Sequence, residues 1–235
     1  MPGDAVDIVA FDVHATLLRW PAGRVQSIEV QQLLADYGVE ISYQAFEAAR
    51  AGVFAFDTPK REIEGWTDFL ALLFARAGVA VSVDLLVCLT RMFETRDGME
   101  PFPETLDVLR RVRAAGRRIV TFTTLPRFML GPRGRAILDY VDDYCNCGTV
   151  GVLKGHPRFY ERLTARWGVP PSRILCVGDD PIGDVLLPTK AGWRAVLLDR
   201  GGRPSAPPPG PIAVIRSMED FPPLIESAGP AGAGG

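Results

Sequence analysis

The sequence predicts an α/β protein in which a Rossmann-like, doubly wound parallel sheet carries an inserted, all-helical cap domain. One observation is that short apolar runs alternate with amphipathic segments over residues 104–226. Parallel strands need a long crossover between them, so this alternation favours a parallel sheet with helices on its faces. A second observation is the stretch 22–96, where apolar residues recur at helical spacing. With 235 residues, the chain is long enough for both parts.

The first element expected is a short buried strand. Residues 6–11 form an apolar run that ends at Asp12, which is typical of a strand that delivers a polar loop at its carboxyl end. Four helices and no strand are expected within residues 22–96. The breaks between these helices fall at Gly38, at residues 57–59 and at residues 78–82. We therefore assign residues 21–97 to the helical cap.

The rest of the chain resumes the alternation of strands and helices. Further strands are expected at residues 119–122, 143–145, 174–177, 194–198 and, after a loop rich in Pro and Gly over residues 201–211, at 212–215. Helices are expected at residues 104–115, 133–141, 157–167, 182–191 and 219–226. The core then comprises residues 1–20 and 98–226. Residues 227–235 are rich in Gly and Ala and are expected to form a disordered tail.

Composition limits the classes of function. Hydrophobic residues make up 47% of the chain, yet no unbroken apolar run approaches the roughly 20 residues of a membrane span, so no membrane partner is expected. The 26 basic residues are balanced by 28 acidic ones, which argues against nucleic acid as a partner. Cys145 and Cys147 lack the two-residue gap of zinc or redox motifs. The N-terminus carries no basic segment, and we expect a cytoplasmic protein.

Polar side chains follow three of the expected strands. They are Asp12, His14 and Thr16 after the first strand, Thr123 and Thr124 after strand 119–122, and Asp179, Asp180 and Asp184 after strand 174–177, with Lys154 between the last two groups. Ligands bind at the carboxyl ends of the strands in open parallel sheets. The carboxylates suit Mg²⁺, a hydroxyl and a lysine suit the anionic oxygens of a substrate, and one carboxylate is available for attack. The residues therefore predict a hydrolytic site with a bound Mg²⁺.

Four segments resemble, in order, the four motifs of the haloacid dehalogenase (HAD) superfamily. They are FDVHATL at residues 11–17, VTFTT at 120–124, Lys154 within LKGHP at 153–157, and VGDDPIGD at 177–184. The resemblance covers roughly residues 7–226, and the helical insertion between the first two motifs resembles the family's C1-type cap. It implies a hydrolase that acts through an aspartate nucleophile.

Carried over position by position, the resemblance assigns the catalytic and metal-binding roles. Asp12 would attack and also bind Mg²⁺, Asp179 would bind the metal, and Asp184 would bind it through water or orient Lys154. Thr123 and Lys154 would hold the transferred group.

Two further positions concern the substrate and the proton. The resemblance implies that Thr124 touches the substrate. His14 departs from the pattern, because phosphatases of the family carry there a second Asp that acts as general acid. In relatives the main-chain carbonyl at this position binds the metal, and any residue supplies one, so the resemblance implies that His14 does so here. The imidazole of His14 is able to carry out acid and base chemistry, so we keep it as a catalytic candidate.

The function expected is that of a Mg²⁺-dependent phosphatase acting on a small phosphorylated molecule, as a monomer or homodimer. One alternative is C–halogen or C–P bond hydrolysis by Asp12. Metal-free dehalogenases have no need of Asp179 and Asp180, and a phosphonatase needs a cap lysine, for which Lys60 is the one candidate in the insertion. Another alternative is a catalytically silent binding protein that has lost its acid at His14. Each residue also has a purely structural reading, such as an N-cap for Asp179 or Asp180.

Overall fold

The core of the computed structural model is a six-stranded sheet in which every strand is parallel to its neighbours, and this confirms the expected α/β class. The structure describes residues 6–202 and 210–226, so the expected tail at 227–235 and most of the 201–211 loop lie outside the described residues. The strand order is β5-β4-β1-β6-β7-β8. The strands are β1 Ile8–Phe11, β4 Arg118–Thr123, β5 Asp143–Asn146, β6 Ile174–Gly178, β7 Arg194–Leu198 and β8 Ala213–Ile215.

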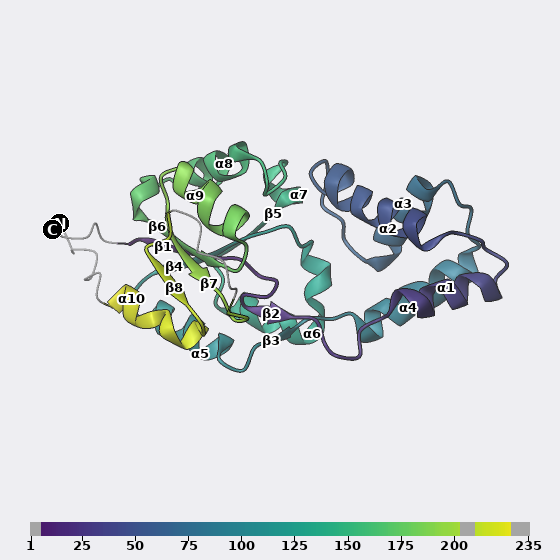
Figure 1. Cartoon of the computed structure of the whole chain (residues 1–235), viewed down its shortest axis with the longest axis horizontal. Helices are drawn as coiled ribbons and strands as arrows, with labels where there is room; N and C mark the ends of the chain where they lie inside the picture. Colours follow the sequence, from purple (N-terminus) through teal and green to yellow (C-terminus); the bar gives the residue numbers. More distant parts are fainter. Residues whose placement is uncertain (1–5, 203–209, 227–235) are drawn as a thin grey trace.

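Strand β1 lies at the centre of the sheet, and its side chains alternate between two hydrophobic clusters. Val9 and Phe11 belong to the cluster that includes helix α5 (Thr105–Ala114), whereas Ile8 and Ala10 pack with α8 (Pro157–Trp167). Figure 1 shows α8 and α9 (Leu187–Lys190) on one face of the sheet and α5 and α10 (Pro222–Glu226) on the other. Because both faces are covered, the central strands β1 and β6 are apolar and buried along their whole length.

Four helices lie beside the sheet, at the right of Figure 1, as expected for residues 22–96. They are α1 Ser27–Asp36, α2 Tyr43–Gly52, α3 Trp66–Ala77 and α4 Val83–Arg96. Ser42 and Ser82 cap α2 and α4 by accepting hydrogen bonds from backbone N–H groups of the first turn. Helix α2 continues into a π-helical turn, Val53–Asp57, which the spacing did not predict. The boundaries 21–97 of the cap domain remain a prediction.

The two segments that join these helices to the sheet are paired with each other. Strands β2 (Leu18–Arg19) and β3 (Glu100–Pro101) form a small antiparallel sheet that the sequence analysis did not anticipate. Next to it, the Asp97 carboxylate accepts a hydrogen bond of 2.6 Å from the Val25 amide. The Arg96 guanidinium binds the Glu29 carboxylate at 2.6 and 2.9 Å. The two connecting segments are therefore held to each other by strand pairing, a hydrogen bond and an ion pair.

Three of the expected helices proved wrong in detail. Residues 131–139 form a short helix α6 (Gly131–Gly134) and a 3₁₀ turn (Arg135–Asp139) in place of one helix over 133–141. The expected helix 182–191 is a π-helical turn, Pro181–Leu186, followed by α9, because Pro188 lacks the N–H that a continuous α-helix needs. The expected helix 219–226 is a 3₁₀ turn (Met218–Asp220) followed by α10.

Other short elements complete the description. Helix α7 (Cys147–Val150) and the 3₁₀ turns Arg127–Leu130 and Pro171–Arg173 were not expected. Among the described residues, no helix has the length and apolar character needed to cross a membrane.

Candidate active site

Asp12 directly follows the central strand, at the carboxyl edge of the sheet. Phe11 pairs with Thr121 of β4 on one side and with Val177 of β6 on the other. The side chain of Asp12 is only 8% exposed. Its Oδ1 accepts a hydrogen bond of 2.5 Å from Lys154 Nζ, and its Oδ2 accepts one of 3.4 Å from Thr16 Oγ1. Burial raises the pKa of Asp12, although Lys154 acts in the opposite direction.

Lys154 joins two of the candidate carboxylates. Its Nζ lies 2.5 Å from Asp12 Oδ1 and 2.6 Å from Asp184 Oδ1, and the side chain is buried. Burial alone lowers the pKa of Lys154, but the two carboxylates outweigh this effect and hold it above its ordinary value. The ammonium also lies 4.4 Å from the centre of the Phe122 ring. Lys154 is therefore a permanently charged cation at the bottom of the site.

Asp12, Asp179 and Asp184 form an acidic cluster in which each residue offers a carboxylate oxygen within 4.8 Å of the others. Asp184 is fully buried, and its Oδ2 accepts a hydrogen bond of 2.8 Å from the Asp180 amide. Burial raises the pKa of Asp184 to about 6 despite the neighbouring Lys154. Three hard oxygen donors of this kind suit a divalent cation such as Mg²⁺. The cluster does not include the His14 side chain. The contribution expected of His14 to metal binding is its main-chain carbonyl.

Gly178 and Asp180 shape the loop that follows β6. A Cβ atom at Gly178 would lie 2.2 Å from Asp184 Oδ2, so this position has room only for glycine. The Asp180 carboxylate accepts hydrogen bonds from the amides of Ile182 and Gly183, at 3.0 and 3.1 Å. Asp180 is thus the capping residue of the pair. Of the two residues, Asp179 is the one that contributes a carboxylate to the acidic cluster.

A cavity of about 310 Å³ opens above these groups, and its walls include Asp12, His14, Thr124, Lys154 and Asp179. Thr124 is exposed there, whereas Thr123 is buried and its Oγ1 accepts a hydrogen bond of 3.3 Å from the Leu125 amide. Of the two threonines, Thr124 is therefore the one on the cavity wall. The remaining sequence-predicted site residues, Asp12, His14, Lys154, Asp179 and Asp184, also line this cavity.

His14 is exposed on the wall of this cavity, with its ring centre 6.2 Å from that of Trp20. Partial burial lowers the pKa of His14, and the positive charges of Arg24 and Lys154 lower it further, although Asp179 acts to raise it. The neutral imidazole is therefore the favoured form at neutral pH. In this form His14 is ready to accept a proton.

Arg200 is a site residue that sequence reasoning missed. It follows β7 and donates hydrogen bonds to the carbonyls of Ala15 and Thr16, at 3.3 and 3.0 Å. Its guanidinium also pairs with Glu104 at 2.7 Å and lies 3.8 Å from the centre of the Phe102 ring. Ala15 has a φ of +60°, which is uncommon for a residue with a side chain. Arg200 thus holds the strained loop that carries His14.

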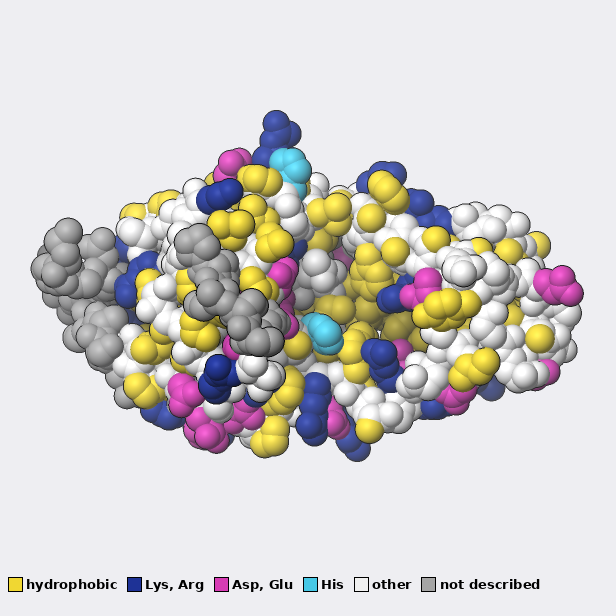
Figure 2. Space-filling model, viewed as in Figure 1, with side chains coloured by type: hydrophobic (Ala, Val, Ile, Leu, Met, Phe, Trp, Pro, Cys, Tyr) yellow, Lys and Arg dark blue, Asp and Glu magenta, His cyan; other side chains and the backbone are white. Residues whose placement is uncertain are grey.

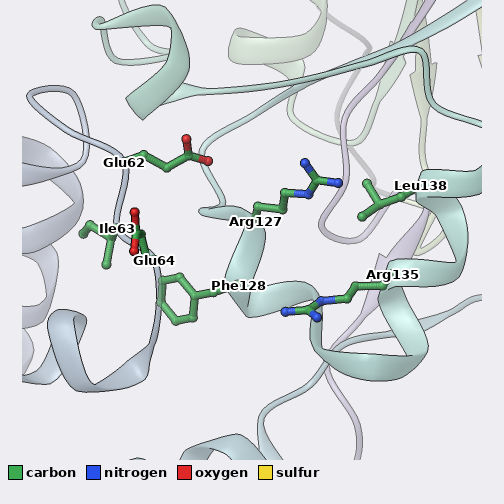
Figure 3. A pocket seen from close by; sticks show the side chains of 7 residues that line it. All are labelled: Glu62, Ile63, Glu64, Arg127, Phe128, Arg135 and Leu138. Carbon is green, nitrogen blue, oxygen red and sulfur yellow. The ribbon is translucent and has the colours of Figure 1, made fainter.

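A second cavity, of about 390 Å³, lies between the segment before α3 and the turns after β4. Its walls carry Glu62 and Glu64 on one side and Arg127 and Arg135 on the other, with Phe128 between them. Figure 3 shows the Glu62 carboxylate and the Arg127 guanidinium on opposite sides of this space. Figure 2 shows that the surface is hollowed between the part with the sheet and the part with α1–α4.

Comparisons with known proteins agree on the fold. A 2-haloacid dehalogenase from Pseudomonas syringae pv. Tomato DC3000 superposes with a TM-score of 0.71 at 19% identity, covering 94% of this chain and 98% of its own. A HAD phosphatase from Thermococcus onnurineus superposes with a TM-score of 0.67 at 19% identity, covering 94% and 99%.

The sequence comparisons add the family. A phosphoserine phosphatase from Thermus thermophilus is 42% identical over 73 residues, which are 31% of this chain and 29% of that protein. The match therefore spans less than a third of that relative's length. The family model for haloacid dehalogenase-like hydrolases matches residues 6–192, which is most of the chain and includes all four motifs. This chain belongs to the haloacid dehalogenase-like hydrolases.

Proposed function

We propose that this hydrolase is a Mg²⁺-dependent phosphatase of a small phosphorylated molecule and that it forms an aspartyl-phosphate at Asp12. The observation that carries the proposal is the acidic cluster of Asp12, Asp179 and Asp184, in which Asp12 and Asp184 both contact the Lys154 ammonium. A halide-displacing enzyme needs one attacking carboxylate, whereas three converging carboxylates suit a cation and a phosphoryl group. The names of the Thermus and Thermococcus relatives lend support.

The metal would be held by Asp12 and Asp179, by the main-chain carbonyl of His14, and by Asp184 directly or through water. The donor set fits, since it consists of hard oxygen atoms that converge at one edge of the sheet. When bound, Mg²⁺ would neutralise negative charge on the transferred phosphoryl group. Lys154 would add a second positive charge on the same side.

Two displacements at phosphorus complete the reaction. An Asp12 carboxylate oxygen attacks phosphorus, the bond to the ester oxygen breaks, and the leaving alkoxide takes a proton from water or from the small fraction of His14 that is protonated. Water then attacks the phosphoryl group, gives a proton to the neutral imidazole of His14, and releases Asp12 and inorganic phosphate. Thr124 would contact the phosphoryl oxygens from the cavity wall. Thr123 lies behind it and accepts a hydrogen bond from the Leu125 amide.

We also propose that residues 21–97 act as a C1-type cap over the core formed by residues 1–20 and 98–226, in a cytoplasmic monomer or homodimer. One structural feature supports the cap: the helices α1–α4 join the core through the paired strands β2 and β3.

Halide displacement by Asp12 is the second candidate. It is favoured by the neutral state of His14, since a departing halide needs no proton, and the Pseudomonas neighbour carries the name of a haloacid dehalogenase. C–P bond hydrolysis has less support, because Lys60 lies exposed on the loop after α2. A silent binding protein would keep the acidic cluster and bind Mg²⁺ without turnover.

The test is hydrolysis of p-nitrophenyl phosphate with Mg²⁺ and with EDTA, by the wild type, Asp12→Asn and His14→Asp. The control is Asp36→Asn, an exposed carboxylate on α1. We expect turnover that requires Mg²⁺, is lost in Asp12→Asn and is kept in the control. Chloride release from a 2-chloroacid with EDTA present, and none from the phosphate ester, would replace the phosphatase by a dehalogenase. Turnover by His14→Asp alone would show that the natural chain has left phosphate-ester chemistry.

A further inference from the structure

We infer that Tyr160 is a positioning residue of the active site, which sets the distance between Lys154 and Asp184 by joining the two chain segments that carry them. This inference rests on the proposed function, because it takes Lys154 and Asp184 as groups that act on the phosphoryl group and the metal. Tyr160 lies on α8, six residues after Lys154, and is fully buried. It does not line the active-site cavity, so it acts through the residues that it holds.

The Tyr160 hydroxyl lies between two main-chain carbonyls from different segments of the chain. Its oxygen is 2.7 Å from the carbonyl oxygen of Lys154 and 2.6 Å from that of Gly183, the residue directly before Asp184. A phenol has a single proton to donate, so the two carbonyls share it. Burial raises the pKa of Tyr160, which keeps the hydroxyl protonated and able to donate. One side chain therefore ties the Lys154 segment to the Asp184 segment.

The backbone pattern leaves the Gly183 carbonyl in need of a donor from elsewhere. Gly183 lies in the π-helical turn Pro181–Leu186, and in a π-helix a carbonyl accepts from the N–H five residues later. For Gly183 that residue is Pro188, which has no N–H. Lys154 lies outside any helix or strand, in the irregular segment between α7 and α8. A buried carbonyl without a donor is costly, so the Tyr160 hydroxyl stabilises both segments where they are.

The Tyr160 ring is held on its own side by aromatic packing. It lies edge-on to the Trp193 ring, with the two centres 5.5 Å apart. The Trp193 N–H donates to the Thr164 hydroxyl at 2.7 Å, one turn further along α8. Trp193 also packs against Phe122, whose ring centre lies 4.4 Å from the Lys154 ammonium. The same group of rings therefore supports the Tyr160 hydroxyl and the Lys154 side chain.

The two segments meet a second time through their side chains. Lys154 Nζ lies 2.6 Å from Asp184 Oδ1 and 2.5 Å from Asp12 Oδ1. Without the Tyr160 hydroxyl, the ion pair alone would hold the segments together, and two buried carbonyls would shift to find other donors. A displacement of about 1 Å at a reacting group costs on the order of 100-fold in rate. Tyr160 thus contributes to turnover without touching the substrate.

The kinetic experiment measures kcat and KM for p-nitrophenyl phosphate with Mg²⁺, for the wild type and Tyr160→Phe. Thr164→Val is the matched control, because the Thr164 hydroxyl bonds the Trp193 N–H and the Tyr160 carbonyl rather than either of the two joined segments. Tyr160→p-aminophenylalanine is the rescue variant, since its amino group has two N–H donors for the two carbonyls. Circular dichroism confirms that each variant is folded at the assay temperature.

A second measurement does not depend on activity. Urea unfolding in EDTA compares Tyr160→Phe, Lys154→Met and the double variant. If Tyr160 sets the position of Lys154, the ion pairs of Lys154 are already weakened in Tyr160→Phe. The double variant then loses less stability than the sum of the two single losses. Residues that stabilise the fold independently give additive losses, as expected for Thr164→Val combined with Lys154→Met.

We expect kcat to fall by on the order of tenfold in Tyr160→Phe while KM changes by less than about twofold. The rescue variant should recover most of kcat, and Thr164→Val should keep both constants. Unchanged kcat in Tyr160→Phe, an equal loss in Thr164→Val, or additive losses of stability would overturn the positioning role and leave the phosphatase proposal standing. No turnover by the wild type would refute the phosphatase proposal, and the comparison of stabilities would then decide the role of Tyr160 by itself.

Discussion

Replacing Lys154 by Met should destabilise the protein strongly in the absence of metal. The ammonium lies 2.5 and 2.6 Å from the carboxylates of Asp12 and Asp184, and all three side chains are at most 9% exposed. Methionine keeps the length of the side chain and removes its charge, so two carboxylates remain buried beside each other. Breaking a buried ion pair in this way costs about 3–5 kcal/mol. That is a large part of the roughly 5–15 kcal/mol that stabilises a typical domain.

The pH dependence of this loss follows from the carboxylates. With Lys154 present, burial already raises the pKa of Asp184 to about 6 and also raises that of Asp12. The lysine lowers both values, so its removal raises them further. A carboxyl whose pKa is higher in the folded state favours folding below its unfolded pKa and loses this contribution as pH rises through its folded pKa. The loss in Lys154→Met should therefore be large near about pH 8 and small near about pH 5.

The assay is urea unfolding in EDTA at both pH values, followed by circular dichroism. Lys190→Met is the control, because Lys190 is exposed at the end of α9. A loss below about 1 kcal/mol, the level of a surface pair, would refute the reasoning. An equal loss at both pH values would show that the buried carboxylates are not its source.

Three further outcomes are expected. Gly148→Ala should lower kcat/KM for a phosphate ester by on the order of tenfold. The new Cβ would lie 3.1 Å from the carbonyl oxygens of Thr58 and Arg61 and would push the loop before α3 away from the core. Arg200→Met should lower kcat by on the order of tenfold with a smaller change in KM, because the loop that carries His14 loses two hydrogen bonds. Excess Mg²⁺ should raise the Tm of the wild type, because a ligand that binds only the folded state stabilises that state. It should not raise the Tm of Asp179→Asn.

Matched variants make these three outcomes specific. Gly23→Ala places a Cβ in open space on a connecting segment and should keep full activity, as should Arg110→Met on the exposed face of α5. Asp139→Asn removes an exposed carboxylate that belongs neither to the acidic cluster nor to the wall of the active-site cavity, and it should keep the response to Mg²⁺. Unchanged kinetics in Gly148→Ala or Arg200→Met, or a full Mg²⁺ response in Asp179→Asn, would contradict the corresponding role.

The parts of the fold that the sequence predicts well are those set by local pattern. Strand β1 and helix α8 follow from apolar runs and helical spacing, and α8 has the bounds expected from residues 157–167. The pattern fails where neighbours in space decide the backbone. Strands β2 and β3 have two residues each, which is too short for a periodic signal, and they exist because they pair with each other.

The candidate site shows the same division. The four motifs place Asp12, Lys154 and Asp184 in order along the chain. In the structure the Lys154 ammonium lies within hydrogen-bonding distance of both carboxylates. Arg200 carries no local signal, because its partners Ala15 and Thr16 precede it by 185 and 184 residues. Such contacts depend on the order of the strands, which no single segment of the sequence encodes.

The pairing of β2 with β3 bears on how this enzyme could have acquired its specificity. Leu18 lies opposite Pro101 and Arg19 opposite Glu100, so the ends of the intervening segment are only about one strand spacing, roughly 5 Å, apart. Seen from the sheet, residues 20–99 occupy the place of a hairpin loop, and the free energy of closing a loop grows only slowly with its length. Helices of another size or sequence would therefore fit the same two ends without moving Asp12. This geometry would allow the helical segment to diverge in evolution while the reaction centre stays constant.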